Sequence, residues 1–125
     1  MIFDTDIFIW AQRGNDKAVK LFEKEEEKYL SVLTYMELLQ NAKSKTQHKY
    51  TKDFLTTFGF IVLPLTENIG HRASIYVEEY TLSSSLGSGD AIIAATAVEN
   101  NMILTSGNVK HFKVIKELQL KAFKS

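Results

Sequence analysis

The chain has 125 residues, a common length for one domain with one hydrophobic core, so we expect a single domain over residues 1–125. Apolar side chains make up 45% of the residues and charged ones 24%, which excludes an intrinsically disordered chain. The 15 basic and 15 acidic side chains cancel, which excludes the strongly cationic balance of many nucleic-acid-binding domains, and the lack of cysteine excludes disulfides and thiolate metal sites.

Short apolar segments alternate with amphipathic ones along the first half of the chain. In chain order, we expect a strand at residues 1–3, a helical turn at 7–10, a helix from residue 15, a strand at 29–32 and a helix at 34–42. Asp4 follows the first strand, and Asp6 is a candidate N-cap for the helical turn. This alternation indicates βαβ units.

The second half continues the same alternation. In chain order, we expect a helix at residues 47–58, a buried strand at 60–63, a helix at 67–80, a Ser/Gly loop at 83–89, a buried helix at 91–98, a strand at 102–105 and a last strand at 114–115. Right-handed crossovers between parallel strands place helices on both faces of one sheet. The predicted fold class is therefore α/β, a three-layer α/β/α domain with a central parallel sheet.

In such a sheet, ligands gather beyond the carboxyl ends of the strands, and acidic residues occur near this edge. Asp4 follows the first strand, although a turn or helix cap is an ordinary alternative. Glu37 lies among apolar side chains, and its alternative role is a capping box with Thr34. Asp90 opens the buried Ala-rich helix, where stabilisation of the helix N-terminus is the alternative.

These three carboxylates come from separate elements, so their joint occurrence is harder to explain by local structure than any one alone. Carboxylates brought together without a partner repel one another and have raised pKa values, so a cluster of them implies a cation. Oxygen ligands favour Mg²⁺ or Mn²⁺. The loop before Asp90 lacks the Lys and Ser/Thr of a P-loop, which argues against nucleotide binding of that kind.

Three separated segments carry a resemblance to a known family. They are DTDIFIW from Asp4, SVLTYMELL from Ser31 and GDAIIAATAVENNMILTSGNVKHF from Gly89. In this order they resemble the PIN-domain family, and more narrowly the VapC-type toxins of type II toxin–antitoxin systems, nearly from end to end. The resemblance implies a PIN-like fold and Mg²⁺-dependent endoribonuclease activity that hydrolyses RNA phosphodiester bonds with an activated water molecule.

The resemblance also implies roles for individual residues. Asp4, Glu37 and Asp90 would form the acidic centre, with Asp4 and Asp90 as the principal metal ligands. Asn108 takes the position at which family members commonly place a fourth acidic residue or an Asn. An amide offers a neutral oxygen, so a second ion would be held more weakly than with four carboxylates.

The family's usual Thr-Arg pair before that position appears here as Ser106 and Gly107, which removes a candidate phosphate contact. The alternative prediction is therefore a catalytically weak or inactive PIN-like module that binds RNA or a partner protein. A receiver domain would need an Asp after a central strand, and residues 60–66 offer none. His48, His71 and His111 lack metal-ligand spacing, so structural or surface roles are predicted for them.

The resemblance implies partners as well: an RNA substrate, a cognate antitoxin protein and a second copy of the chain in a homodimer. No apolar run approaches the roughly 20 residues of a membrane span, and the first residues lack a signal peptide's basic region. We therefore expect no membrane association and a cytoplasmic protein.

Overall fold

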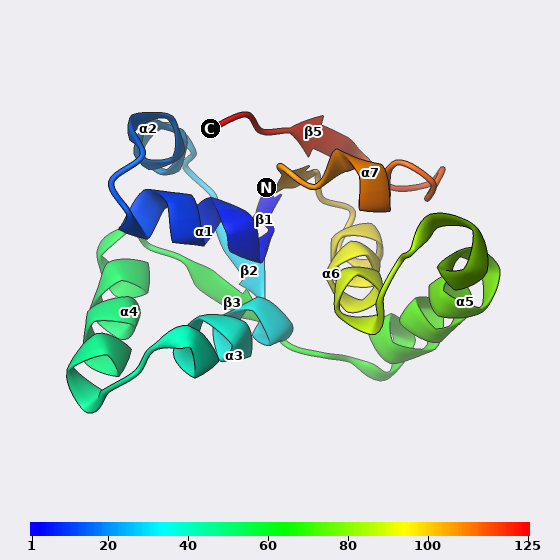
Figure 1. Cartoon of the computed structure of the whole chain (residues 1–125), viewed down its shortest axis with the longest axis horizontal. Coiled ribbons are helices and arrows are strands. Elements are labelled where there is room, and N and C mark those ends of the chain that lie inside the picture. Colours follow the sequence, from blue (N-terminus) through cyan, green and yellow to red (C-terminus); the bar gives the residue numbers. More distant parts are fainter.

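A parallel sheet of five strands forms the centre of the computed structural model, which describes all 125 residues (Figure 1). The strand order is β3-β2-β1-β4-β5, and every neighbouring pair runs parallel. The strands are β1 Ile2–Phe3, β2 Tyr29–Ser31, β3 Ile61–Leu63, β4 Leu104–Ser106 and β5 Leu120–Ala122. Because all strands point the same way, the residues that follow β1, β2 and β4 meet at one edge of the sheet, called the carboxyl edge below.

Seven helices connect the strands: α1 Thr5–Gln12, α2 Asp16–Lys24, α3 Val32–Asn41, α4 Lys45–Thr57, α5 Glu67–Ser84, α6 Ser88–Glu99 and α7 Val109–Phe112. Figure 1 shows α1 to α4 on one side of the sheet and α5 to α7 on the other. The three-layer α/β/α prediction with a central parallel sheet is confirmed. None of the helices combines the length and the apolar character that a membrane crossing requires.

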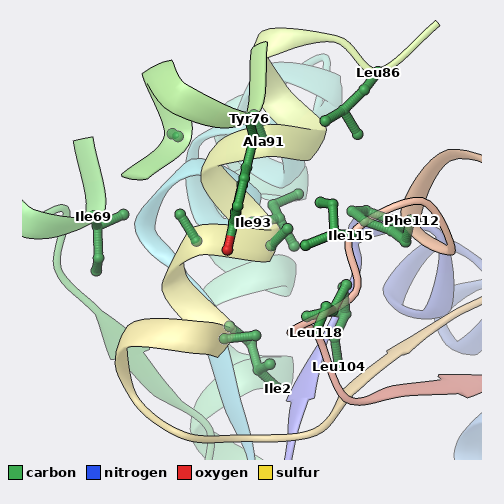
Figure 2. Packing of buried hydrophobic residues seen from close by; sticks show 14 residues of the cluster. Ile2, Ile69, Tyr76, Leu86, Ala91, Ile93, Leu104, Phe112, Ile115 and Leu118 are labelled. Carbon is green, nitrogen blue, oxygen red and sulfur yellow. The ribbon is translucent and has the colours of Figure 1, made fainter. Parts of the chain in front are cut away.

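The helix α6 is the centre of the larger hydrophobic cluster (Figure 2). Six of its residues are buried, four of them alanines, so neighbouring backbones can approach it closely. Tyr76 from α5 and Phe112 from α7 pack against it, together with Ile115 and Leu118 after α7. The predicted buried helix at 91–98 is confirmed, and its packing holds Asp90, in its first turn, in a fixed place.

Phenylalanine rings fill the cluster on the opposite face of the sheet. Phe22 of α2 lies at the centre, with its ring centroid 5.0 Å from that of Phe3, 5.1 Å from Phe8 and 4.9 Å from Phe60. All three pairs meet edge to face or tilted, which is the favoured arrangement of aromatic side chains. This packing fixes β1 and α1, and with them the turn that contains Asp4.

Two strand predictions differ from the structure. The segment 60–63 forms β3, but β3 is an edge strand, and Ile61 and Val62 remain 55% and 37% exposed, so the prediction of a buried strand is wrong. The predicted strand at 114–115 is also wrong: these residues follow α7, Ile115 is buried in the core, and the last strand is β5. In the sequence, a short apolar run looks the same whether it forms a central strand, an edge strand or a buried segment without strand structure.

Candidate active site

Asp4 is the most deeply buried acidic residue of the carboxyl edge, with only 6% of its surface exposed. Its Oδ1 accepts a hydrogen bond from the backbone N–H of Thr5 at 2.8 Å, which makes Asp4 the N-cap of α1. Its Oδ2 accepts from the hydroxyl of Ser106, at the end of β4, at 2.7 Å. The N-cap prediction for Asp6 is therefore wrong, and Asp4 combines a capping role with a contact between two strand ends.

Burial is the main reason that the pKa of Asp4 is raised from 3.8 to about 7. The negative charge of Asp6 raises this pKa next, and that of Asp90 adds a smaller contribution. The hydrogen bonds from Ser106 and Thr5 act in the opposite direction without offsetting the rise. The ionised carboxylate is thus poorly compensated by the protein itself, and a cation beside it would stabilise it.

Asp6, in the first turn of α1, is a further acidic residue of the site, beyond the N-cap role predicted for it. Its Oδ2 accepts a hydrogen bond from the backbone N–H of Gly107 at 2.9 Å, whereas its Oδ1 is buried and has no hydrogen-bond partner. Burial is also the main cause of a raised pKa for Asp6, to which the charge of Asp90 contributes. The Asp-x-Asp spacing at a strand end was the available signal in the sequence.

The contact with Asp6 requires a residue without a side chain at position 107. A Cβ atom there would lie 2.7 Å from Oδ2 of Asp6 and 3.4 Å from the carbonyl oxygen of Phe123. The 2.7 Å approach is closer than Cβ contacts in proteins, so any other residue would push the end of the Asp6 side chain away, whereas the distance to the Phe123 oxygen is an ordinary contact. Gly107 and Asp6 are therefore a matched pair, and an arginine at position 107 would disrupt the present arrangement.

We expect Gly107→Ala to lower the free energy of unfolding by about 1–3 kcal/mol, because it overpacks a tight contact. The control is Gly70→Ala in α5, where a Cβ meets no atom within 4 Å and helix propensity favours alanine. Urea unfolding of both variants checks this. Equal midpoints for Gly107→Ala and the unchanged protein would show that the Asp6 contact is not tight.

Glu37 reaches the carboxyl edge from the second turn of α3. The N-cap of α3 is Ser31, whose side chain accepts from the backbone N–H of Thr34 at 3.0 Å, so the alternative of a Thr34–Glu37 capping box is wrong. Instead, Oε1 of Glu37 accepts a hydrogen bond from the hydroxyl of Thr5 at 2.7 Å. This bond ties Glu37 to the residue next to Asp4.

Asp90 lies across the edge, in the first turn of α6, and contacts a histidine. Its Oδ2 is 2.9 Å from Nδ1 of His111, and the side-chain amide nitrogen of Asn108 lies 2.8 Å from the same Nδ1. Asn108 occupies the N-cap position of α7, but its side chain makes no capping bond. The ring of His111, for which a structural or surface role is predicted, lies among the predicted site residues.

The structure thus brings the predicted residues to one edge in one connected set of contacts. Asp4 and Asn108 are linked through Ser106, whose Oγ accepts from the backbone N–H of Asn108 at 2.9 Å and donates to Asp4. Glu37 joins through Thr5, and Asp90 joins through His111. No three acidic or histidine side chains already stand close enough together to hold one ion.

The donor chemistry nevertheless fits a hard divalent cation. Asp4 is a buried carboxylate with a raised pKa, and Asp6 has a buried oxygen without a partner. Both are oxygen donors, as Mg²⁺ and Mn²⁺ prefer. Because no three such side chains yet stand close enough together, ligation would require the carboxylates at this edge to move closer to one another.

A separate cavity of about 560 Å³ lies at the opposite end of α6. There Arg72 of α5 bonds Glu99 at 2.5 Å and Glu117 at 2.7 Å. These ion pairs tie α5 to the end of α6 and to the segment before β5. Since Asp90 and Glu99 lie at opposite ends of a 12-residue helix, this cavity is distinct from the carboxylate site.

Comparison with known proteins gives a consistent result. Residues 1–118 match the PIN domain family. Ribonuclease VapC1 of Rickettsia felis is 29% identical over 130 residues, which cover 96% of this chain and 93% of the relative.

Solved structures show the same fold. In a toxin–antitoxin complex from Klebsiella pneumoniae, one chain is 30% identical with a TM-score of 0.79, over 94% of this chain and 93% of that one. In VapBC2 from Rickettsia felis, bound to a DNA fragment from its promoter, the TM-score is 0.79 at 22% identity, over 99% of this chain and 100% of that one. At this lower identity the likeness extends to the fold alone.

Proposed function

Because this chain belongs to the PIN-domain family, we propose that it is a divalent-metal-dependent endoribonuclease and the toxin of a toxin–antitoxin pair. The observation that carries the proposal is the buried Asp4 carboxylate, with its raised pKa, beside Asp6 and Asp90 at the carboxyl edge. The likeness to ribonuclease VapC1 supports RNA as the substrate. The bonds from Thr5 and Ser106 offset only part of the cost that burial adds to ionising this carboxylate, and a bound cation would offset the rest.

In this proposal, Asp4 and Asp90 hold Mg²⁺ or Mn²⁺, and Glu37 completes the acidic centre. The bound ion supplies Lewis-acid activation of water and stabilises negative charge on the phosphate oxygens. Ser106 and the N–H of Thr5 fix both oxygens of Asp4. Glu37, held by the Thr5 hydroxyl, accepts the proton of the attacking water.

The proposed reaction is the hydrolysis of an RNA phosphodiester bond. Water attacks phosphorus, the bond from phosphorus to the 3′ oxygen breaks, and that oxygen takes up a proton. The products carry a 5′ phosphate and a 3′ hydroxyl. A single-stranded or looped RNA presents its phosphates to such an edge more readily than a duplex does.

The direct test is incubation of the purified chain with single-stranded RNA in the presence of Mg²⁺ or Mn²⁺, and in parallel with EDTA. We expect cleavage with either ion, none with EDTA, and recovery when excess Mg²⁺ is added back. The ends of the products should carry 5′ phosphates. Cleavage that continues unchanged in EDTA would contradict a metal-dependent mechanism.

We also propose a cognate antitoxin, since the solved relatives include a toxin–antitoxin complex, and a homodimer, which the family resemblance implies. An antitoxin arginine that enters the carboxylate cluster would supply guanidinium charge in place of the ion. The intact pair should then resist RNA cleavage until the two proteins are separated. Undiminished cleavage by the intact complex would refute this mode of inhibition.

A further inference from the structure

The contact between His111 and Asp90 has no part in the reaction described above. Nδ1 of His111 lies 2.9 Å from Oδ2 of Asp90, and both side chains are partly exposed. An ionised carboxylate only accepts hydrogen bonds, so the imidazole must donate from Nδ1. In the neutral ring this places the single N–H on Nδ1 and leaves Nε2 without a proton.

We propose that His111 is a positioning residue that orients Asp90 for the metal ion, an inference that rests on the proposed function. The donated hydrogen bond engages Oδ2 of Asp90 and leaves Oδ1 free to bind. Histidines and carboxylates that pair next to a metal site fix ligand orientation in this way and commonly change metal affinity 10- to 100-fold. His111 itself does not bind the ion.

Asn108 extends this contact into a bridge between the two principal carboxylates. Its amide lies 2.8 Å from Nδ1 of His111, and its backbone N–H donates to Ser106, which donates to Asp4. A half-turn of the amide, which hardly changes its shape, presents Oδ1 to the ring N–H. The single N–H at Nδ1 is then shared between Oδ2 of Asp90 and Oδ1 of Asn108, and these contacts link Asp90 to Asp4 through Asn108 and Ser106.

The ring can be changed without loss of the fold. The helix α7 is anchored by Phe112, which is fully buried, whereas the side chain of His111 is 37% exposed. The backbone of α7 is also held independently, by the bond from Lys113 N–H to the Val109 carbonyl. Variants at position 111 therefore report on the Asp90 contact.

Two amide substitutions separate the roles of the ring nitrogens, because the Asn amide nitrogen takes the place of Nδ1 and the Gln amide nitrogen takes the place of Nε2. Mn²⁺ binding to the full chain is measured by calorimetry and by electron paramagnetic resonance. We expect His111→Gln to weaken Mn²⁺ binding about 10-fold or more, and His111→Asn to stay within about threefold of the unchanged protein. The matched control, His71→Gln on the exposed surface of α5, should bind Mn²⁺ normally.

A metal-free measurement completes the test. A long-range ¹H–¹⁵N spectrum of the unchanged protein should show the neutral ring of His111 protonated at Nδ1. A ring protonated at Nε2, equal Mn²⁺ binding by His111→Gln and the unchanged protein, or equal losses for His111→Gln and His111→Asn would overturn the proposal. Nitrogen hyperfine coupling from His111 to bound Mn²⁺ would overturn it too, because His111 would then be a ligand.

These readouts keep the two proposals apart. If the protein binds Mn²⁺ with the expected order of variants but cleaves no RNA, the ribonuclease proposal fails and the role of His111 stands. If RNA is cleaved but the variants do not bind Mn²⁺ in the expected order, the proposal for His111 fails and the ribonuclease proposal stands. A protein that binds no Mn²⁺ would overturn both.

Discussion

Asp90→Asn and Asp4→Asn are each expected to lower RNA cleavage at least about 100-fold, because each removes a charged ligand of the proposed ion. The amide keeps the size of the carboxylate and offers a neutral oxygen. Asp90 lies partly exposed in the first turn of α6, so its replacement leaves the core unchanged. Initial cleavage rates at saturating Mg²⁺ measure the effect.

The control is Asp53→Asn, which removes a carboxylate that pairs with Lys49 on the exposed face of α4. It should cleave RNA at the normal rate. Circular dichroism must show that all three variants remain folded. Full activity in a folded Asp90→Asn protein would exclude Asp90 as a principal ligand.

The second large effect concerns stability and pH. Burial raises the pKa of Asp4 from 3.8 to about 7, so the folded state favours the neutral carboxyl. The neutral Asp4 carboxyl makes its full contribution to stability below its pKa of 3.8 in the unfolded chain, and this contribution is lost as the pH rises through about 7. In EDTA, the free energy of unfolding of Asp4→Asn, relative to that of the unchanged protein, should therefore rise by about 2–4 kcal/mol from about pH 4 to about pH 8.

Urea unfolding at both pH values measures this difference, and the comparison cancels groups that titrate alike in the two proteins. Added Mg²⁺ at the higher pH should stabilise the unchanged protein, because an ion that binds only the folded state shifts unfolding. It should stabilise Asp4→Asn much less. A difference between the two proteins that does not vary with pH would show that Asp4 ionises freely in the folded state.

The layers of the fold and three of its acidic residues follow from local patterns in the sequence. Alternating strands and helices predict the parallel sheet, and the Ala-rich segment after Asp90 predicts a buried helix, α6. The role of Glu37 was undecided, because a capping box with Thr34 fits the same residues. The N-cap at Ser31 rules out the capping box, and the contact of Glu37 with Thr5, which is 32 residues away in the chain, brings Glu37 to the acidic residues.

Other parts of the site depend on contacts between distant segments. Asp6 and Gly107 are 101 residues apart, and Asp90 and His111 are 21 apart, so no local periodicity reports either pair. A histidine on a one-turn helix has no spacing that distinguishes it from a surface residue. The edge strand β3 and the late strand β5 were misjudged for a related reason, since exposure depends on neighbouring elements.

The contact between Asp6 and Gly107 also bears on the alternative function, a catalytically weak or inactive binding module. A non-catalytic module was considered because Gly107 and Asn108 depart from the family's pattern. The close approach of Asp6 explains why position 107 is a glycine. Asn108 contacts His111 and so takes part in the link between Asp4 and Asp90. Both residues therefore fit the arrangement of acidic side chains at this edge.

The central claim is metal-dependent RNA cleavage at Asp4 and Asp90, and sequencing of 5′-phosphate RNA ends after induced expression tests it most directly. Cells that express the unchanged protein should accumulate new ends at discrete positions in a limited set of RNAs. Cells that express Asp90→Asn at the same level should lack them. The same new ends in both, or none in either, would contradict the account.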